Sequence, residues 1–464
     1  MLEKHVIATG VDAKTGLPIF HSMDWKENLF DLIQECSLHD TIAPEFTGIG
    51  SYDKSTFYRR FDLSNPKTAK WGLVVHTSEA VKLEEKLAPL IEFRDGVVFR
   101  YNGENAYKWR REKKATIANP DDFPFYLLIA GSPEKIPFEF QFVLDATQSV
   151  GRIHFDDIDD YEKYAETVVK YEERKIEPPA KKLVLFSSEE DYAMKVAAGS
   201  LANPLYSELT KNTLPNNFQV TNLRSREATK DNLIKQFQVE SPGKSPALLF
   251  SVCHGTGVYT QNNLQAKLQG ALCCYGKRNP LTDTNRVGYI TGYDIPAQFK
   301  MPGGIAFLFT CYGAGSMRDS DFARYLSDDN PYKNVFLKFQ AKKDFVAHMP
   351  KKLLSDGGAL AVVGHFDPAW VSRDRSASAM VERLNPFRMT LGELMMGGPV
   401  GFAAKIFNER YSSISEQLTS ELEKYAKEKN FKDVDLHRFN DLWQMRNDAK
   451  NYVVIGDPAA HIML

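Results

Sequence analysis

The chain contains little cysteine for its length. Its 464 residues include five cysteines: Cys36, Cys253, Cys273, Cys274 and Cys311. An odd and low count does not suit a disulfide framework and is typical of proteins in a reducing compartment. The cysteines also lack the paired C-x-x-C spacing of a structural zinc site. We therefore expect no bound metal and no other cofactor.

The sequence also lacks long hydrophobic runs and an excess of charge of one sign. No segment approaches the roughly 18 apolar residues of a membrane span. The first residues, MLEKHVIATGVDAKTG, lack the apolar core of a signal peptide. The 58 Lys and Arg residues nearly balance the 60 Asp and Glu residues. We therefore expect a cytoplasmic protein that binds neither a membrane nor nucleic acid directly.

Alternating strand and helix patterns predict an α/β protein. Apolar stretches such as WGLVVH (71–76), YLLIAG (126–131) and LVLFSS (183–188) are predicted strands. Helices are predicted at roughly 376–396 and 399–427. This alternation predicts a mostly parallel sheet with helices on both faces. Pro178-Pro179 marks a boundary, so the chain is divided into residues 1–118 with no assigned role, a smaller α/β subdomain at 119–179 and a main subdomain at 180–464.

Two of the predicted strands end in reactive side chains. Residues 247–257 read ALLFSVCHGTG and residues 305–316 read IAFLFTCYGAGS. The first strand ends at His254, and the second ends at Cys311, where Gly313 and Gly315 are expected to permit a sharp turn. Taken alone, either residue would more commonly be structural. Because neighbouring parallel strands end at the same sheet edge, the two together predict a thiol–imidazole pair.

Such a pair predicts acyl transfer. The Cys311 thiolate would attack a peptide carbonyl, and His254 would take the thiol proton and later protonate the leaving amine. The backbone N–H of Gly255, and that of Cys311, would stabilise the oxyanion. A water molecule would then release the acyl enzyme.

Competing motifs are weaker. Residues 270–277, GALCCYGK, depart from a phosphate loop in glycine spacing and are followed by Arg278 rather than Ser or Thr. No GxSxG elbow is present, which argues against a serine hydrolase. His365 also follows a strand and a glycine, so it is an alternative base, although a packing role is favoured.

Several stretches occur in an order shared with a known family. They are YLLIAGSPEKIP (126–137), GRIHFDDIDDYEKYAETVVKYEERKI (151–176), SVCHGTG (251–257), FLFTCYGAG (307–315), ALAVVGHFDPAW (359–370) and VIGDPAAHIML (454–464). Over about residues 124–464 the chain resembles the gingipain-like cysteine peptidases. That family shares the caspase-like fold of clan CD with caspases, separases and CHAT-domain proteases.

The resemblance implies an endopeptidase acting on protein substrates, with His254 as base and Cys311 as nucleophile. It also implies a caspase-like sheet preceded by a smaller α/β subdomain. In family members of arginine specificity, an acid before the Gly-Arg segment and a tryptophan line the first substrate pocket. Asp145 and Trp370 are the counterparts here, and Asp374 is an alternative because Asp145 lies closer to the Gly-Arg segment than in the family. An acidic floor would favour Arg or Lys before the scissile bond.

The resemblance also bears on regulation. CHAT-type relatives act in bacterial defence, so by analogy we expect an activating or inhibitory protein partner that orders loops 259–298 and 316–343. Gingipains are secreted with a propeptide, whereas this chain shows no signal segment. Two alternatives stay open: a catalytically silent scaffold or binding module, and a thiol enzyme acting on a non-peptide acyl group.

Overall fold

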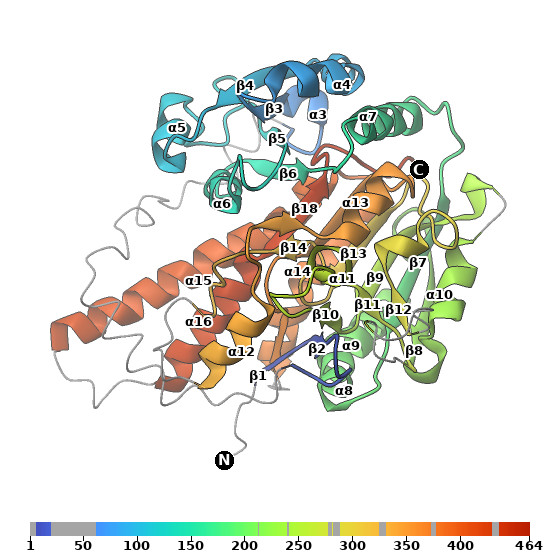
Figure 1. The fold of residues 1–464 in the computed structure, drawn as a ribbon, viewed down its shortest axis with the longest axis vertical. Coiled ribbons are helices and arrows are strands. Elements are labelled where there is room, and N and C mark those ends of the chain that lie inside the picture. Colours follow the sequence, from blue (N-terminus) through green and yellow to red (C-terminus); the bar gives the residue numbers. More distant parts are fainter. Residues whose placement is uncertain are drawn as a thin grey trace.

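A ten-stranded sheet runs through the molecule (Figure 1). The computed structural model describes residues 6–19, 62–211, 213–238, 241–276, 281, 288–323, 331–372, 377–428 and 436–464. Across the sheet, the strands are β4 (Val97–Tyr101), β3 (Trp71–His76), β5 (Tyr126–Ala130), β6 (Ser149–Ile153), β18 (Tyr452–Gly456), β16 (Ala361–His365), β13 (Ile305–Phe309), β9 (Pro246–Val252), β7 (Ala180–Ser187) and β8 (Gln219–Arg224). Every neighbouring pair is parallel except β16 with β18.

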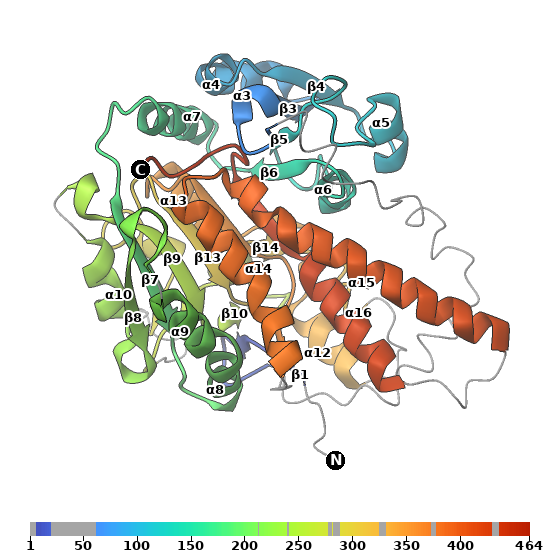
Figure 2. The ribbon, with the colours of Figure 1, turned by 180° about the vertical axis from the view of Figure 1, so that it is seen from behind.

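Helices cover both faces of this sheet. The α-helices of the described residues are α3 (Pro66–Ala69), α4 (Ala80–Phe93), α5 (Ala106–Glu112), α6 (Phe138–Asp145), α7 (Asp159–Glu172), α8 (Tyr192–Ala197), α9 (Asn203–Lys211), α10 (Lys230–Phe237), α11 (Gln265–Leu268), α12 (Pro331–Phe339), α13 (His348–Ser355), α14 (Ala377–Met395), α15 (Val400–Glu428) and α16 (Leu436–Lys450). Helix α13 lies over one face, and α14 and α15 cover the other (Figures 1 and 2). The predicted fold class is confirmed, and the arrangement is consistent with a caspase-like α/β fold.

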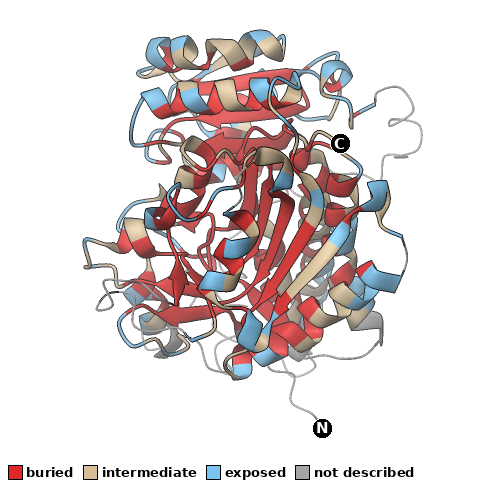
Figure 3. Cartoon of the chain, turned by 90° about the vertical axis from the view of Figure 1, so that its right-hand side faces the viewer, coloured by how far each residue is buried: buried red, intermediate tan, exposed pale blue. Residues whose placement is uncertain are grey.

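The central strands are long apolar runs because both of their faces are covered. All residues of β5, β9 and β13 are buried, and Figure 3 shows the buried strands at the centre of the molecule. Strands of parallel sheets typically read as continuous hydrophobic stretches for this reason. The edge strand β8 is more polar and more exposed.

Strands β3 to β6 form a smaller α/β unit with a core on each face. Leu128 of β5 packs in the main core with residues of α4 and α7. Its neighbours Leu127 and Ile129 pack in a second core around Trp109 and Phe140. Strands β3 and β4 come from residues 1–118, to which the sequence assigned no role, and they extend the same sheet. No helix of the described ranges is long and apolar enough to span a membrane.

The Gly-Arg and Gly-Asp-Pro stretches meet where β6 pairs with β18. A Cβ on Gly151 would overlap the Gly456 carbonyl oxygen, so only glycine fits there. The Asp457 carboxylate accepts hydrogen bonds from Trp71 Nε1 (2.8 Å) and Arg94 Nε (2.9 Å). Arg94 also binds Glu172 of α7 with both terminal nitrogens. These buried contacts join the smaller unit to the C-terminal segment.

Short strands surround the carboxyl ends of β9 and β13. Two of the small sheets involve the N-terminal residues: a two-stranded sheet β1–β17 and a four-stranded sheet β12–β11–β10–β2. The short strands are β1 (Val6–Ala8), β2 (Gly10–Asp12), β10 (Gly255–Gly257), β11 (Leu272–Cys273), β12 (Tyr289–Ile290), β14 (Gly315–Ser316), β15 (Phe345–Val346) and β17 (Trp370–Ser372). Residues 6–12 therefore lie beside the strand ends that carry His254 and Cys311.

Candidate active site

The structure brings the strand ends of His254 and Cys311 side by side. Strands β9 and β13 are adjacent and parallel, and Val252 pairs with Phe309. His254 and Cys311 each follow two residues later. The register is maintained past the strand ends, because Thr310 Oγ1 donates to the Cys253 carbonyl oxygen at 3.0 Å. The predicted nucleophile and base thus lie at equivalent positions of one sheet edge.

Gly255 packs directly against the nucleophile's backbone. A Cβ at this position would overlap the Cys311 carbonyl oxygen and would lie 3.0 Å from Thr310 Oγ1. Any larger residue would therefore push the two strand ends apart. The three residues predicted for the chemistry, His254, Gly255 and Cys311, lie together in the fold.

The turn after Cys311 differs from the prediction. The left-handed residue is Tyr312, with φ of 60°, rather than a glycine. Gly315 is needed for space instead, since a Cβ there would overlap the Phe345 carbonyl oxygen. A non-glycine residue in this region costs on the order of 1 kcal/mol. Backbone bonds to β16 and the loop after it offset that cost: Tyr312 N–H donates to Asp367 O and Ala314 N–H to His365 O.

Asp191 orients His254, and the sequence analysis did not identify it. Its Oδ2 lies 2.7 Å from His254 Nε2. Its Oδ1 accepts the Met194 N–H at 3.0 Å as the N-cap of α8. A carboxylate only accepts hydrogen bonds, so Nε2 carries the ring proton and Nδ1 is the basic nitrogen. Asp191 follows β7, the neighbour of β9, and begins a helix, which are signals that could have identified it.

The Cys311 thiol is fully buried in this structure. The Ala369 N–H donates to Sγ at 3.2 Å, and Thr9 Oγ1 lies 3.5 Å away. Burial raises the pKa of the thiol to about 12, against the opposing effect of these hydrogen bonds. The thiol is therefore neutral near pH 7 while it remains covered.

An N-terminal segment covers the thiol, and it binds as an extended strand. β1 pairs antiparallel with β17, with Ala8 opposite Trp370. The next residue, Thr9, donates its N–H to Ala369 O at 3.0 Å. Its carbonyl oxygen accepts the Gly255 N–H at 2.9 Å. The N–H predicted to stabilise an oxyanion thus already binds a peptide carbonyl.

The segment continues past the thiol as β2, parallel to β10. Gly10 pairs with Gly255, and a Cβ built on Gly10 would lie 3.3 Å from Cys311 Sγ. The Thr9–Gly10 peptide bond therefore lies beside Sγ. The sequence pattern of this segment predicts no role for it.

The proposed pocket residues have different settings. Trp370 lies in β17 beside Ala8, and its backbone N–H donates to Asp448 Oδ1 at 2.9 Å. Asp145 lies at the end of α6, where its carboxylate accepts the Val150 N–H at 3.0 Å. Burial raises the pKa of the Asp145 carboxyl, and Lys405 of α15 opposes that rise. These contacts hold Asp145 between α6 and β6, and Asp374 lies outside the described residues, so a pocket role for either stays a prediction.

His365, the alternative base, has structural contacts. Its Nδ1 lies 3.0 Å from Asp367 O and its Nε2 lies 3.0 Å from Asp448 O. Burial lowers the pKa of this imidazole, but its bonds to Asp448 and Asp367 more than offset that effect. Two carbonyl oxygens call for two N–H donors, which leaves no ring nitrogen for proton uptake.

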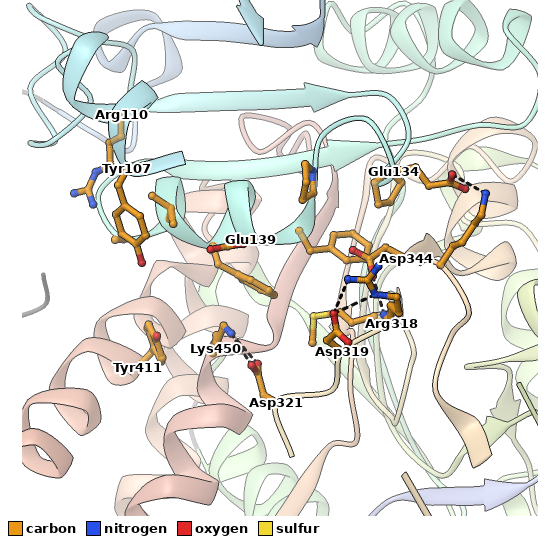
Figure 4. A pocket seen from close by; sticks show the side chains of 18 of the residues that line it. Tyr107, Arg110, Glu134, Glu139, Arg318, Asp319, Asp321, Asp344, Tyr411 and Lys450 are labelled. Carbon is orange, nitrogen blue, oxygen red and sulfur yellow. Dashed lines mark hydrogen bonds and ion pairs between the residues drawn. The ribbon is translucent and has the colours of Figure 1, made fainter. Parts of the chain in front are cut away.

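A cavity of about 650 Å³ lies outside this site, between α6, α15, α16 and residues 317–321 and 342–344 (Figure 4). Side chains of both charges line it, and the ion pair of Lys450 with Asp321 (2.8 Å) lies in its wall. His254 and Cys311 are not among its lining residues. Within the described part of the chain, no cluster of three or more His, Cys, Asp or Glu side chains is placed to hold a metal ion.

Comparison with known proteins shows similarity to solved structures. No family model and no curated protein matches the chain. Among solved structures, one match is described as "Structure of Protease", at 12% identity and a TM-score of 0.42, over 85% of this chain and 79% of that chain. A similarity of this size carries no argument about activity.

Proposed function

We propose that this protein is a cysteine peptidase that hydrolyses peptide bonds of protein substrates, with Cys311 as nucleophile and His254 as base. One observation supports the proposal: an extended peptide segment lies against the Cys311 thiol and the Gly255 N–H. Its Thr9 N–H and carbonyl oxygen are both bound, by Ala369 and Gly255. Strand addition of this kind is a common mode of peptide recognition.

The residues have complementary roles in this proposal. His254 Nδ1 removes the thiol proton as Sγ attacks the peptide carbonyl carbon. The Gly255 N–H stabilises the charge that develops on the carbonyl oxygen. His254 then protonates the leaving amine, and water hydrolyses the thioester. Asp191 acts as a positioning residue, because it selects the ring tautomer and stabilises the imidazolium.

The edge of β17 supplies the binding surface for the residues before the scissile bond. Its backbone pairs with β1 in the structure, and Trp370 lies beside Ala8, the residue before Thr9. Control by a protein partner, a cytoplasmic location and a role in bacterial defence remain predictions from the sequence and from the family resemblance.

The proposal is tested by active-site labelling and peptide cleavage with the full chain. A thiol-reactive peptide probe and a quenched peptide library are applied to the wild type, Cys311→Ala, His254→Ala and the control Cys273→Ala. Because the N-terminal segment covers the thiol, Thr9→Pro is included, since it removes the N–H that binds Ala369. We expect labelling and cleavage in Thr9→Pro, the wild-type level of both in the control Cys273→Ala, none in Cys311→Ala, and a loss of about a hundredfold or more in His254→Ala.

Two results would argue for the alternatives. If neither the wild type nor Thr9→Pro reacts with probe or library, the protein is a silent scaffold. If Cys311 is labelled but no peptide is cut, the thiol acts on another acyl group. The library also reports the residue preferred before the bond.

A further inference from the structure

We infer that the chain cleaves its own Thr9–Gly10 peptide bond and thereby removes the segment that blocks its substrate groove. This inference rests on the proposed peptidase function. It goes further because it assigns the first substrate, which is a described part of the chain itself.

The polarity of the bound segment favours cleavage at this bond. The chain enters along β17, where Thr9 N–H binds Ala369 O, and its carbonyl then meets the Gly255 N–H. The thiol lies beside the following bond, because Sγ is 3.5 Å from Thr9 Oγ1 and a Cβ built on Gly10 would lie 3.3 Å from Sγ. The carbonyl carbon between these atoms is the one that Sγ would attack.

The two sides of the bond are held by different contacts. After the bond, Gly10 O accepts the Ile19 N–H at 2.8 Å, and Asp12 N–H donates to Leu17 O at 2.9 Å. Val11 is buried with Cys273 and Tyr289. A new amino terminus at Gly10 would therefore stay anchored.

Before the bond, β1 is held by three residue pairs with β17. Once its covalent link is cut, an isolated pairing of this length is marginal in water. The segment ending at Thr9 would dissociate and expose the edge of β17. That edge would then be available to another extended peptide.

The chemical step needs water as its only co-reactant. The Cys311 S–H proton passes to His254 as the S–C bond to Thr9 forms. The C–N bond to Gly10 then breaks, and the imidazolium proton passes to the Gly10 nitrogen. Water cleaves the thioester, which gives the Thr9 carboxylate and restores the thiol.

The bound residues also indicate the class of later substrates. Ala8 and Thr9 are fully buried, opposite Trp370 and against Ala369 respectively. A Cβ on Gly10 would contact Ile19 Cδ1 at 3.3 Å, which is tight. The groove as described therefore fits small residues on both sides of the bond. This differs from the basic residue that the family resemblance led us to expect.

The test follows the N-terminus of the full-length protein by amino-terminal sequencing and intact mass during incubation. We expect a new terminus at Gly10 in the wild type, at a rate constant independent of protein concentration, and no cleavage in Cys311→Ala. Thr9→Arg should slow cleavage at least tenfold. Thr15→Arg, an exposed threonine of the same N-terminal hairpin, should leave the rate unchanged.

Failure of this inference is distinguishable from failure of the proposed function. If the wild type keeps its Thr9–Gly10 bond while Thr9→Pro is labelled at Cys311 and cuts library peptides, self-cleavage is wrong and the peptidase stands. Faster cleavage in Thr9→Arg would refute the small-residue groove. If no variant reacts with probe or library, both proposals fall.

Discussion

Replacing Asp191 by asparagine tests the orientation of His254 without altering the size of the side chain. Asparagine caps helices as well as aspartate does, so Oδ1 can keep its bond to the Met194 N–H. The change places an NH₂ group where Oδ2 now lies 2.7 Å from Nε2. Two donors cannot share that bond. The ring would move its proton to Nδ1, the nitrogen that has to accept the thiol proton.

The expected size of the effect follows from the bond that is lost. A hydrogen bond to a charged group contributes about 1.5–3 kcal/mol net. At about 1.4 kcal/mol per tenfold change in rate, this corresponds to a roughly ten- to hundredfold slower reaction. The unfavourable tautomer adds to that loss. The cap is kept, but a bond to a charged carboxylate is replaced by one to a neutral amide, so the free energy of unfolding should fall by about 1–2 kcal/mol.

The assay compares kcat/KM on a library-derived peptide with the urea unfolding midpoint. Thr229→Ala is the matched control, because Thr229 caps α10 by accepting the Asn232 N–H at 3.2 Å. Loss of this helix cap in Thr229→Ala should lower the free energy of unfolding by about 1 kcal/mol and leave activity intact. If Asp191→Asn turns over within twofold of the wild type, Asp191 does not set the orientation of His254.

Three further predictions concern stability. Arg94→Met leaves two buried carboxylates without their cation and should cost about 3–5 kcal/mol in urea unfolding; a cost below about 1 kcal/mol would contradict this. Gly255→Ala should lose activity and at least about 1–3 kcal/mol, because its Cβ meets backbone, whereas Gly392→Ala, in open space within α14, should gain about 0.5–1 kcal/mol. Burial raises the pKa of Asp367 from 3.8 to about 7, so its stabilising contribution is complete below pH 3.8 and is lost as pH rises through 7. The thermal unfolding temperature of Asp367→Asn should lack that loss between pH 4 and 8. If the unfolding temperatures of the wild type and the variant change in parallel over this range, the assignment to Asp367 is wrong.

The parts of the fold that could be predicted are those encoded by local pattern. Continuous apolar runs identified β9 and β13, because strands covered on both faces need no polar alternation. Helical spacing predicted helices at roughly 376–396 and 399–427, and the structure has α14 at Ala377–Met395 and α15 at Val400–Glu428. The strand ends at His254 and Cys311 were identified for the same reason.

Other features depend on contacts that no local pattern encodes. The Gly-Arg and Gly-Asp-Pro stretches could be matched to a family, but the reason for Gly151 lies in its contact with Gly456, more than 300 positions later. The turn at Cys311 was attributed to glycine, yet Tyr312 takes the left-handed conformation. Surrounding backbone bonds override the local preference there, which sequence reasoning cannot weigh.

The N-terminal segment shows most clearly where local reasoning ends. VIATGVD is too short for either of its pairings to be predicted, and Thr9 and Ala369 are 360 positions apart. A strand edge accepts an extended chain through backbone groups, so the partner is selected by geometry and proximity more than by side-chain type. The groove can thus be located because the chain itself occupies it. Because residues 6–9 occupy the edge of β17 and lie against Cys311, binding of any other peptide along β17 requires their departure first.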